Sequence, residues 1–133
     1  MRDHKLIRVA VKVALIGLIG SAVAAGPLSQ QEVTTLISGS KVTQRGDDPS
    51  KRGSQILEYD AGGKVTRTHT GTEHRGVVES GTWQVNANGQ LCVTWHGQAQ
   101  PNCQYLVPTG TGNYNLTQDP AKRGKMTITG VSK

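Results

Sequence analysis

The plausible metal-binding set in the sequence consists of His69, His74 and His96 together with Glu73. The spacing between His69 and His74 occurs in zinc sites, but a second pair of Cys or His residues accompanies it there. No such pair is present here. We therefore expect polar histidines on a loop and a strand, with no metal and no other cofactor.

Catalytic motifs are equally sparse. A serine nucleophile would need a Gly-x-Ser-x-Gly elbow, which the sequence lacks. Glycoside hydrolysis would need two facing carboxylates, and no pattern selects a pair from Glu58, Asp60, Glu73 and Glu79. We therefore expect no enzymatic activity, although a site assembled from distant strands would leave no local motif.

The N-terminus has the pattern of a secretory signal peptide. Four basic residues precede an uncharged run over residues 13–25 that ends in small side chains. Cleavage before Ala25 and cleavage before Gly26 both fit. The run is shorter than the roughly 20 apolar residues of a membrane span. We therefore predict a signal peptide at residues 1–24 and one soluble, periplasmic or secreted domain at residues 25–133.

Cleavage would remove most of the positive charge. The full chain has 15 basic and 9 acidic residues, a formal charge of +6. Without residues 1–24, which hold four basic residues and one acidic residue, eleven and eight remain, so the charge falls to +3. This small, dispersed excess argues against a nucleic acid partner, and we expect no contact with a membrane after cleavage.

Cys92 and Cys103 are the two cysteines of the chain. In an exported protein they pair most simply with each other, which leaves no thiol for catalysis. A regular hairpin with the two cysteines opposite each other would place Pro101 opposite Thr94 at a hydrogen-bonded position, where proline has no N–H to donate. We therefore predict an irregular loop over residues 97–102, with the disulfide joining a strand to the far end of that loop.

The remaining elements follow from local patterns. Ser29 and Glu32 form a capping box that begins a short amphipathic helix at about residues 30–38, and Gly39 can end it. From residue 41 onward, runs of Val, Thr, Ile, Tyr and Trp alternate with turn residues. The predicted strands are residues 41–44, 55–59, 64–70, 76–79, 81–86, 90–96, 103–107, 112–117 and 125–129.

These nine segments, counted as seven or eight sequential strands with short turns, favour a mainly β fold, an antiparallel meander that closes into a small barrel or a curved sheet. Alternation predicts which side chains share the core face of each strand. These are Trp83 with Val85, Leu91 with Val93 and Trp95, Leu57 with Tyr59, and Tyr105 with Val107.

The order Gly81-Thr82-Trp83, Leu91-Cys92-Val93-Thr94-Trp95, Cys103 and Gly112-Asn113-Tyr114 resembles a family of small exported proteobacterial proteins, the domain of unknown function 995 and its relatives. The resemblance spans most of residues 25–133. It implies a periplasmic or secreted β domain with a bonded cysteine pair, and it brings no catalytic residues. The chain departs from the family pattern in the loop at residues 46–53 and in its basic C-terminal part.

Exposed polar residues at one end of the predicted barrel form a candidate binding surface. They are His96, Gln98 and Gln100 of the irregular loop, with the basic turns Lys51-Arg52 and Lys122-Arg123. The first hypothesis is a non-enzymatic binding or accessory domain that contacts a protein, a cell-wall component or a small molecule. The alternative is an inhibitor of an exported hydrolase such as a lysozyme-type enzyme, since preorganised loops lose little entropy on binding. A hydrolase with a dispersed site ranks third. A filled barrel would favour protein contact through loops, and a cavity would favour an apolar ligand.

Overall fold

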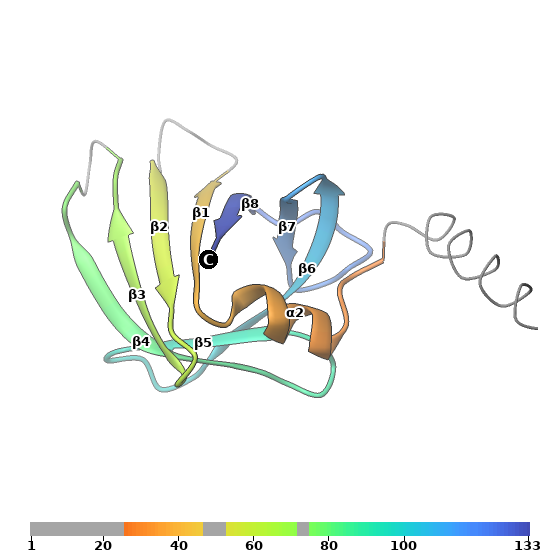
Figure 1. Ribbon diagram of the computed structural model, residues 1–133, viewed down its shortest axis with the longest axis horizontal. Coiled ribbons are helices and arrows are strands. Elements are labelled where there is room, and N and C mark those ends of the chain that lie inside the picture. The colour runs from red at the N-terminus through yellow and green to blue at the C-terminus, as the bar shows by residue number, and fades with distance from the viewer. Residues whose placement is uncertain (1–25, 47–52, 72–74) are drawn as a thin grey trace, which may run out of the picture.

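The described residues form a closed β-barrel with one short helix. A computed structural model describes residues 26–46, 53–71 and 75–133. Eight antiparallel strands follow one another around the barrel, and β8 pairs with β1 to close it (Figure 1). This confirms the predicted meander in its barrel form. The elements are α2 (Gln30–Ile37), β1 (Ser40–Gly46), β2 (Ser54–Tyr59), β3 (Lys64–His69), β4 (Val78–Val85), β5 (Leu91–Trp95), β6 (Asn102–Gly110), β7 (Asn113–Thr117) and β8 (Met126–Ser132).

The predicted signal peptide, residues 1–24, lies outside the described residues. Within the described ranges, no helix combines the length and the apolar character that crossing a membrane requires.

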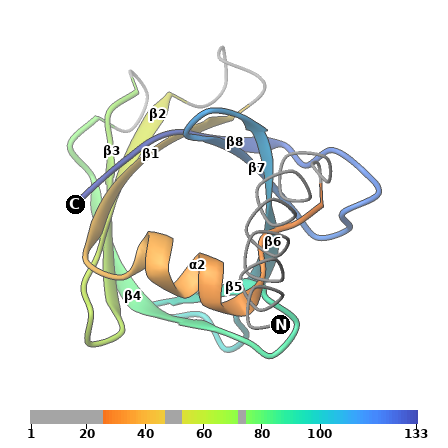
Figure 2. The ribbon, with the colours of Figure 1, turned by 45° about the vertical axis from the view of Figure 1, so that its right-hand side comes forward.

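Helix α2 crosses the ring of strands at one end of the barrel (Figure 2). The capping box is confirmed, because the Ser29 hydroxyl accepts a hydrogen bond from the Glu32 backbone N–H and the Glu32 carboxylate accepts one from the Ser29 backbone N–H. Val33 and Ile37 are fully buried in the core. Gly39, with φ at +72°, then turns the chain into β1. Helix α2 therefore acts as an apolar lid on this end of the barrel.

The inward-facing side chains are mostly apolar near α2 and mostly polar toward the opposite end, and the two sets meet where Leu57 faces Arg67 and Leu91 faces Gln104. Because strand side chains alternate between faces, the register of each strand pair shows which residues point inward. The apolar half lies against α2 and consists of Val33, Ile37, Val42, Leu57, Val65, Leu91, Leu106 and Ile128. The polar half lies toward the opposite end, where β1, β3 and β5 end and β2, β4 and β6 begin. It consists of Gln44, Gln55, Arg67, His69, Glu79, Trp95, Asn102 and Gln104.

Two expectations about the strands are wrong. The predicted segments 76–79 and 81–86 belong to one continuous strand, β4, because Gly81 stays in the ladder opposite Val65 and Trp95. On β6, Tyr105 and Val107 face outward, and Leu106 faces inward opposite Leu116. The segment after β7 lies against the outer face of β7, where Asn115 is hydrogen bonded to Gly124.

Candidate functional site

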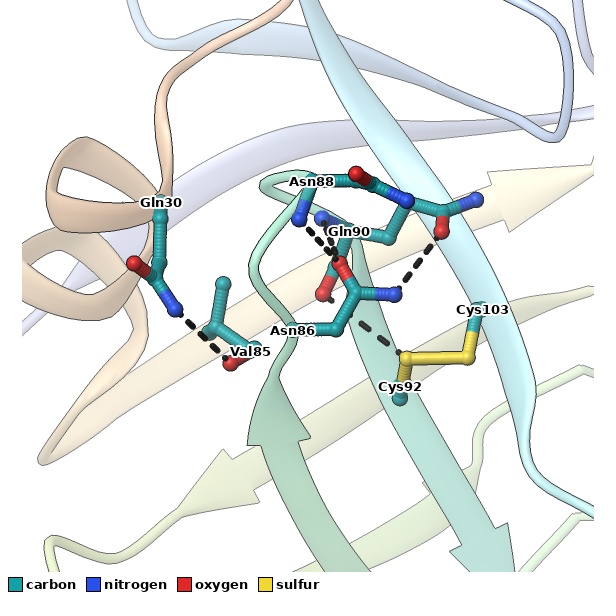
Figure 3. Close-up of a disulfide and its surroundings, with 7 residues drawn as sticks. All are labelled: Gln30, Val85, Asn86, Asn88, Gln90, Cys92 and Cys103. Carbon is teal, nitrogen blue, oxygen red and sulfur yellow. Dashed lines mark hydrogen bonds between the residues drawn. A yellow bond between two sulfur atoms is a disulfide. The ribbon is translucent and has the colours of Figure 1, made fainter.

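The disulfide between Cys92 and Cys103 is confirmed, and it lies on the outer face of the barrel (Figure 3). The two cysteines are directly opposite each other in β5 and β6, with a Cα to Cα distance of 4.0 Å. The ladder continues to Val93 opposite Asn102 and then stops before Pro101. Cys103 is therefore inside a strand and not at the far end of a loop, and the irregular part is residues 96–101.

The neighbouring turn between β4 and β5 is a rigid part of the scaffold (Figure 3). The Asn86 side-chain oxygen accepts hydrogen bonds from the backbone N–H groups of Asn88 and Gln90, and the Asn86 amide donates to Gln90 Oε1 at 2.8 Å. The Gln30 side chain of α2 donates to the Val85 carbonyl oxygen at 3.4 Å. The disulfide and this turn therefore hold β4, β5, β6 and α2 together, and they offer no reactive thiol.

The residues of the predicted binding surface lie on separate loops. His96, Gln98 and Gln100 are exposed in the connection between β5 and β6, whereas Lys122 and Arg123 are exposed in the connection between β7 and β8. Strands β6 and β7 separate these connections in the barrel order. Lys51 and Arg52 lie outside the described residues. The described members of this surface therefore lie on two different connections of the barrel.

The predicted histidine set is also divided. His69 points into the barrel and His96 is exposed on a loop, while Glu73 and His74 lie outside the described residues. Over residues 26–46, 53–71 and 75–133, no group of three or more His, Cys, Asp or Glu side chains could hold a metal ion.

The connection carrying Lys122 and Arg123 is held firmly by two buried polar side chains. Asn115 is 4% exposed; its amide donates to the carbonyl oxygens of Gly124 and Met126, and its oxygen accepts from the Gly124 N–H at 2.7 Å. Thr117 Oγ1 lies 2.8 Å from the carbonyl oxygens of both Asp119 and Lys122. This connection is therefore preorganised.

The polar half of the barrel contains a charged cluster centred on Glu79. Arg67 Nε and Nη2 donate to Glu79 Oε1 at 2.9 and 2.8 Å, and His69 Nε2 lies 2.6 Å from the same oxygen. An ionised carboxylate only accepts hydrogen bonds, so the His69 nitrogen is the donor. The Arg67 guanidinium also stacks on Trp95, 4.1 Å from the ring centroid. Glu79 of β4 thus holds the edge of the Arg67 guanidinium, and Trp95 of β5 holds its face.

Two side chains in this region have shifted acidities. The hydrogen bond from His69, followed by the bonds and charge of Arg67, holds the pKa of Glu79 below its usual range, although burial opposes this shift. Burial raises the pKa of Tyr59 far above its usual range, and the nearby Arg67 charge only partly offsets this. At neutral pH, Glu79 is therefore an anion and the Tyr59 hydroxyl keeps its proton.

A cavity of about 50 Å³ lies beside Tyr59 and Arg67. On the scale of roughly 10–15 Å³ per water, it has room for three or four atoms of water size. Tyr59 is 4% exposed and lines the cavity, and its hydroxyl makes no hydrogen bond to the described residues. The other lining residues are Gln44, Leu57, Arg67, Leu91, Val93, Trp95, Asn102, Gln104 and Leu116. The interior is therefore mostly filled, and its remaining space is too small and too polar for the apolar ligand considered above.

Larger hollows lie on the outside of the barrel but are less specific. One of about 660 Å³ runs beside Lys41, Glu58 and Lys64, all exposed. Lys133 also borders it, and its Nζ is already hydrogen bonded to the carbonyl oxygens of Thr35 and Ser38. The internal cavity is the stronger candidate site because Tyr59 and Arg67 line it together.

Arg67, His69, Glu79 and Tyr59 were not assigned to a site from sequence. Val65, Arg67 and His69 alternate on one face of β3, and this face meets Leu57 and Tyr59 of β2. The sequence did contain one signal, because Arg67 and His69 continue, at every second position, the strand face that begins with the apolar Val65. Its meaning depended on the register with β2 and β4, which no local motif fixes.

Comparison of the chain with models of protein families, with curated proteins and with solved structures gives no match. The resemblance to the domain of unknown function 995 therefore stays a prediction.

Proposed function

We propose that the protein is an exported, non-catalytic binding protein that holds a small polar group in the polar half of its barrel. An eight-stranded barrel has an interior wide enough to be filled by side chains or to hold one small ligand. Here α2 and the aliphatic residues fill one half, and the other half keeps a small polar cavity.

The Tyr59 hydroxyl is the single observation that carries this proposal. A buried hydroxyl without a hydrogen bond costs about 1–3 kcal/mol, so such groups are rare in folded proteins. Tyr59 lies in the core, and its hydroxyl faces a cavity that Arg67, Gln44 and Gln104 also line. A small polar ligand would satisfy the hydroxyl and remove this cost.

The lining of the cavity favours binding over catalysis. Among the described residues that line it there is no serine, threonine or cysteine that could act as a nucleophile. The nearby carboxylate of Glu79 is already bonded to Arg67 and His69 through one oxygen. These groups are arranged to hold a ligand rather than to transfer a proton or an acyl group.

Two features support export to the periplasm or the medium. The pattern of residues 1–24 is that of a signal peptide. The cysteines are joined in a disulfide, which persists in oxidising compartments. The balance of charges in residues 25–133 gives no reason to expect nucleic acid as a partner.

The experiment is a screen of small polar solutes against the protein purified from cells that export the full chain. Thermal unfolding and native mass spectrometry would be measured for the wild type and for Tyr59→Phe. We expect at least one solute to bind one to one and to stabilise the wild type but not the variant. Solutes that stabilise both proteins equally, or no stabilising solute at all, would contradict the proposal.

A second candidate is an inhibitor of an exported hydrolase, and the preorganised connection after β7 favours it. The hydrogen bonds from Asn115 and Thr117 present Lys122 and Arg123 without loss of loop entropy on binding. In a turbidity assay with lysozyme-type enzymes, an inhibitor would slow lysis, and Lys122→Ala would weaken this effect. Lysis at the uninhibited rate with the wild type would exclude this role for those enzymes.

A further inference from the structure

We propose that the group bound in the polar half is a carboxylate, held by the guanidinium of Arg67 and the hydroxyl of Tyr59. This inference rests on the binding function proposed above and specifies its ligand. The carboxylate could belong to a free small acid or to the C-terminus of a peptide, and the test below separates these sources.

Arg67 still has donors to offer. Its Nε and Nη2 atoms both donate to Glu79 Oε1, and its Nη1 atom makes no hydrogen bond to the described residues. Stacking on Trp95 fixes the guanidinium plane without using any N–H group. An arginine held in this way can donate hydrogen bonds to a second carboxylate from its other edge, because its five N–H groups form a planar fork.

Tyr59 offers one more donor. Its hydroxyl stays protonated at neutral pH, lines the same cavity as Arg67, and is close enough for the Arg67 charge to act on it. Donors from Arg67 and Tyr59 need an acceptor, which excludes a metal cation or an ammonium group as the ligand. A charged acceptor forms hydrogen bonds about twice as strong as a neutral one.

The size of the cavity and its remaining lining residues also favour a small carboxylate as the ligand. Room for three or four atoms fits a carboxylate with one or two carbon atoms. The aliphatic side chains of Leu57, Leu91 and Val93 supply an apolar wall for the carbon, and the amides of Gln44 and Gln104 remain near the oxygens. An acetate-sized group meets all of these conditions.

The test compares acetate with acetamide, which has nearly the same shape but no charge. Dissociation constants would be measured by NMR titration at constant ionic strength, following the Arg Nε–Hε and tyrosine signals. The protein would be purified from cells that export the full chain. The variants are Arg67→Met, Arg67→Lys and Tyr59→Phe. Arg45→Met, on an exposed residue of β1, and Tyr105→Phe, on the outer face of β6, are the matched controls.

We expect acetate to bind at least about tenfold more tightly than acetamide, and to lose about tenfold in affinity in Arg67→Met and in Tyr59→Phe, because hydrogen bonds to a charged acceptor are stronger than those to a neutral one. Arg67→Lys should keep part of the affinity, and the two controls should keep all of it. If Arg67→Met does not fold, Arg67→Lys and Tyr59→Phe still decide the outcome.

N-Acetyl-glycyl-glycine and its C-terminal amide distinguish the source. Tighter binding of the free peptide acid than of acetate indicates a peptide C-terminus, whereas binding of acetate alone indicates a free small acid. If acetamide binds as tightly as acetate and depends on Tyr59, the binding function stands and the carboxylate inference fails. If neither solute perturbs these signals, the carboxylate inference fails as well, and the wider solute screen decides the binding function.

Discussion

The two halves of the barrel interior are built on opposite principles. In the apolar half, Val33 and Ile37 of α2 close the barrel with aliphatic side chains, and this packing leaves no polar group to satisfy. Toward the polar half, Arg67 and Tyr59, the latter from the α2 end of β2, line a small cavity, and the Tyr59 hydroxyl and one edge of Arg67 make no hydrogen bond to the described residues. Packing of aliphatic side chains stabilises the first half, whereas the second half keeps polar groups that bound water or a ligand would satisfy.

Among the changes considered, truncation of Ile37 in the apolar half should have the largest effect on the free energy of unfolding. Ile37→Ala removes a fully buried side chain from the lid of the apolar half and should lower the free energy of unfolding by about 3–4 kcal/mol. Leu36→Ala, one position earlier and only partly buried, is the control and should cost about 1 kcal/mol. Urea denaturation would measure both. Equal costs for the two variants would mean that α2 does not close the core as described.

Reduction of the disulfide should have the next largest effect. Cys92 and Cys103 close a short loop, with a sequence separation of 11, and its removal should lower the free energy of unfolding by about 3 kcal/mol. Ligand affinity should stay unchanged in whatever fraction remains folded, because the disulfide lies on the outer face of the barrel. Urea denaturation with and without a reducing agent provides the measurement. A reduced protein that stays folded but loses its ligand would show that the disulfide also shapes the polar half.

The fold could be read from the sequence in most of its parts. The capping box at Ser29 and Glu32 predicted α2 to within one residue at its end, and alternation placed Trp83 and Val93 on the inner face. Turn residues such as Gly63 and Gly89, both with positive φ, separated the strands correctly. These features are local, so one sequence is enough to reveal them.

The candidate site could not be read in the same way. Arg67 and Glu79 meet only because β3 and β4 pair in a register that sets them opposite each other, and Tyr59 of β2 lines the same cavity as Arg67. The error on Tyr105 and Val107 has the same origin, because a strand with apolar residues on both faces does not reveal which face is inside. Both the meeting of Arg67 with Glu79 and the outward orientation of Tyr105 and Val107 depend on how the barrel closes, which is a long-range property.

Loss of the Glu79 charge should have a smaller effect that depends on pH. The pKa of Glu79 is lower in the folded protein than in the unfolded chain, so its charge stabilises the fold above the unfolded pKa of about 4.5. This contribution is lost as the pH falls through the folded pKa. Glu79→Gln should therefore cost about 1 kcal/mol at neutral pH, a modest value because the side chain is 39% exposed.

Urea denaturation of Glu79→Gln and the wild type across this pH range would reveal the dependence. The gap in unfolding free energy between the two proteins should narrow as the pH falls. Glu58→Gln, on an exposed residue of β2, is the control for loss of a carboxylate. A gap that is the same at every pH would mean that the contacts from Arg67 and His69 do not stabilise the Glu79 anion.

The most direct measurement is the stability of Tyr59→Phe with and without acetate, beside the control Tyr105→Phe. Without acetate, we expect Tyr59→Phe to be as stable as the wild type or up to about 1 kcal/mol more stable, because an unpaired buried hydroxyl is removed. With acetate, the wild type and Tyr105→Phe should gain stability and Tyr59→Phe should gain little. A loss of about 2 kcal/mol in Tyr59→Phe without acetate, or an equal gain in all three proteins with it, would contradict the division between a stabilising half and a binding half.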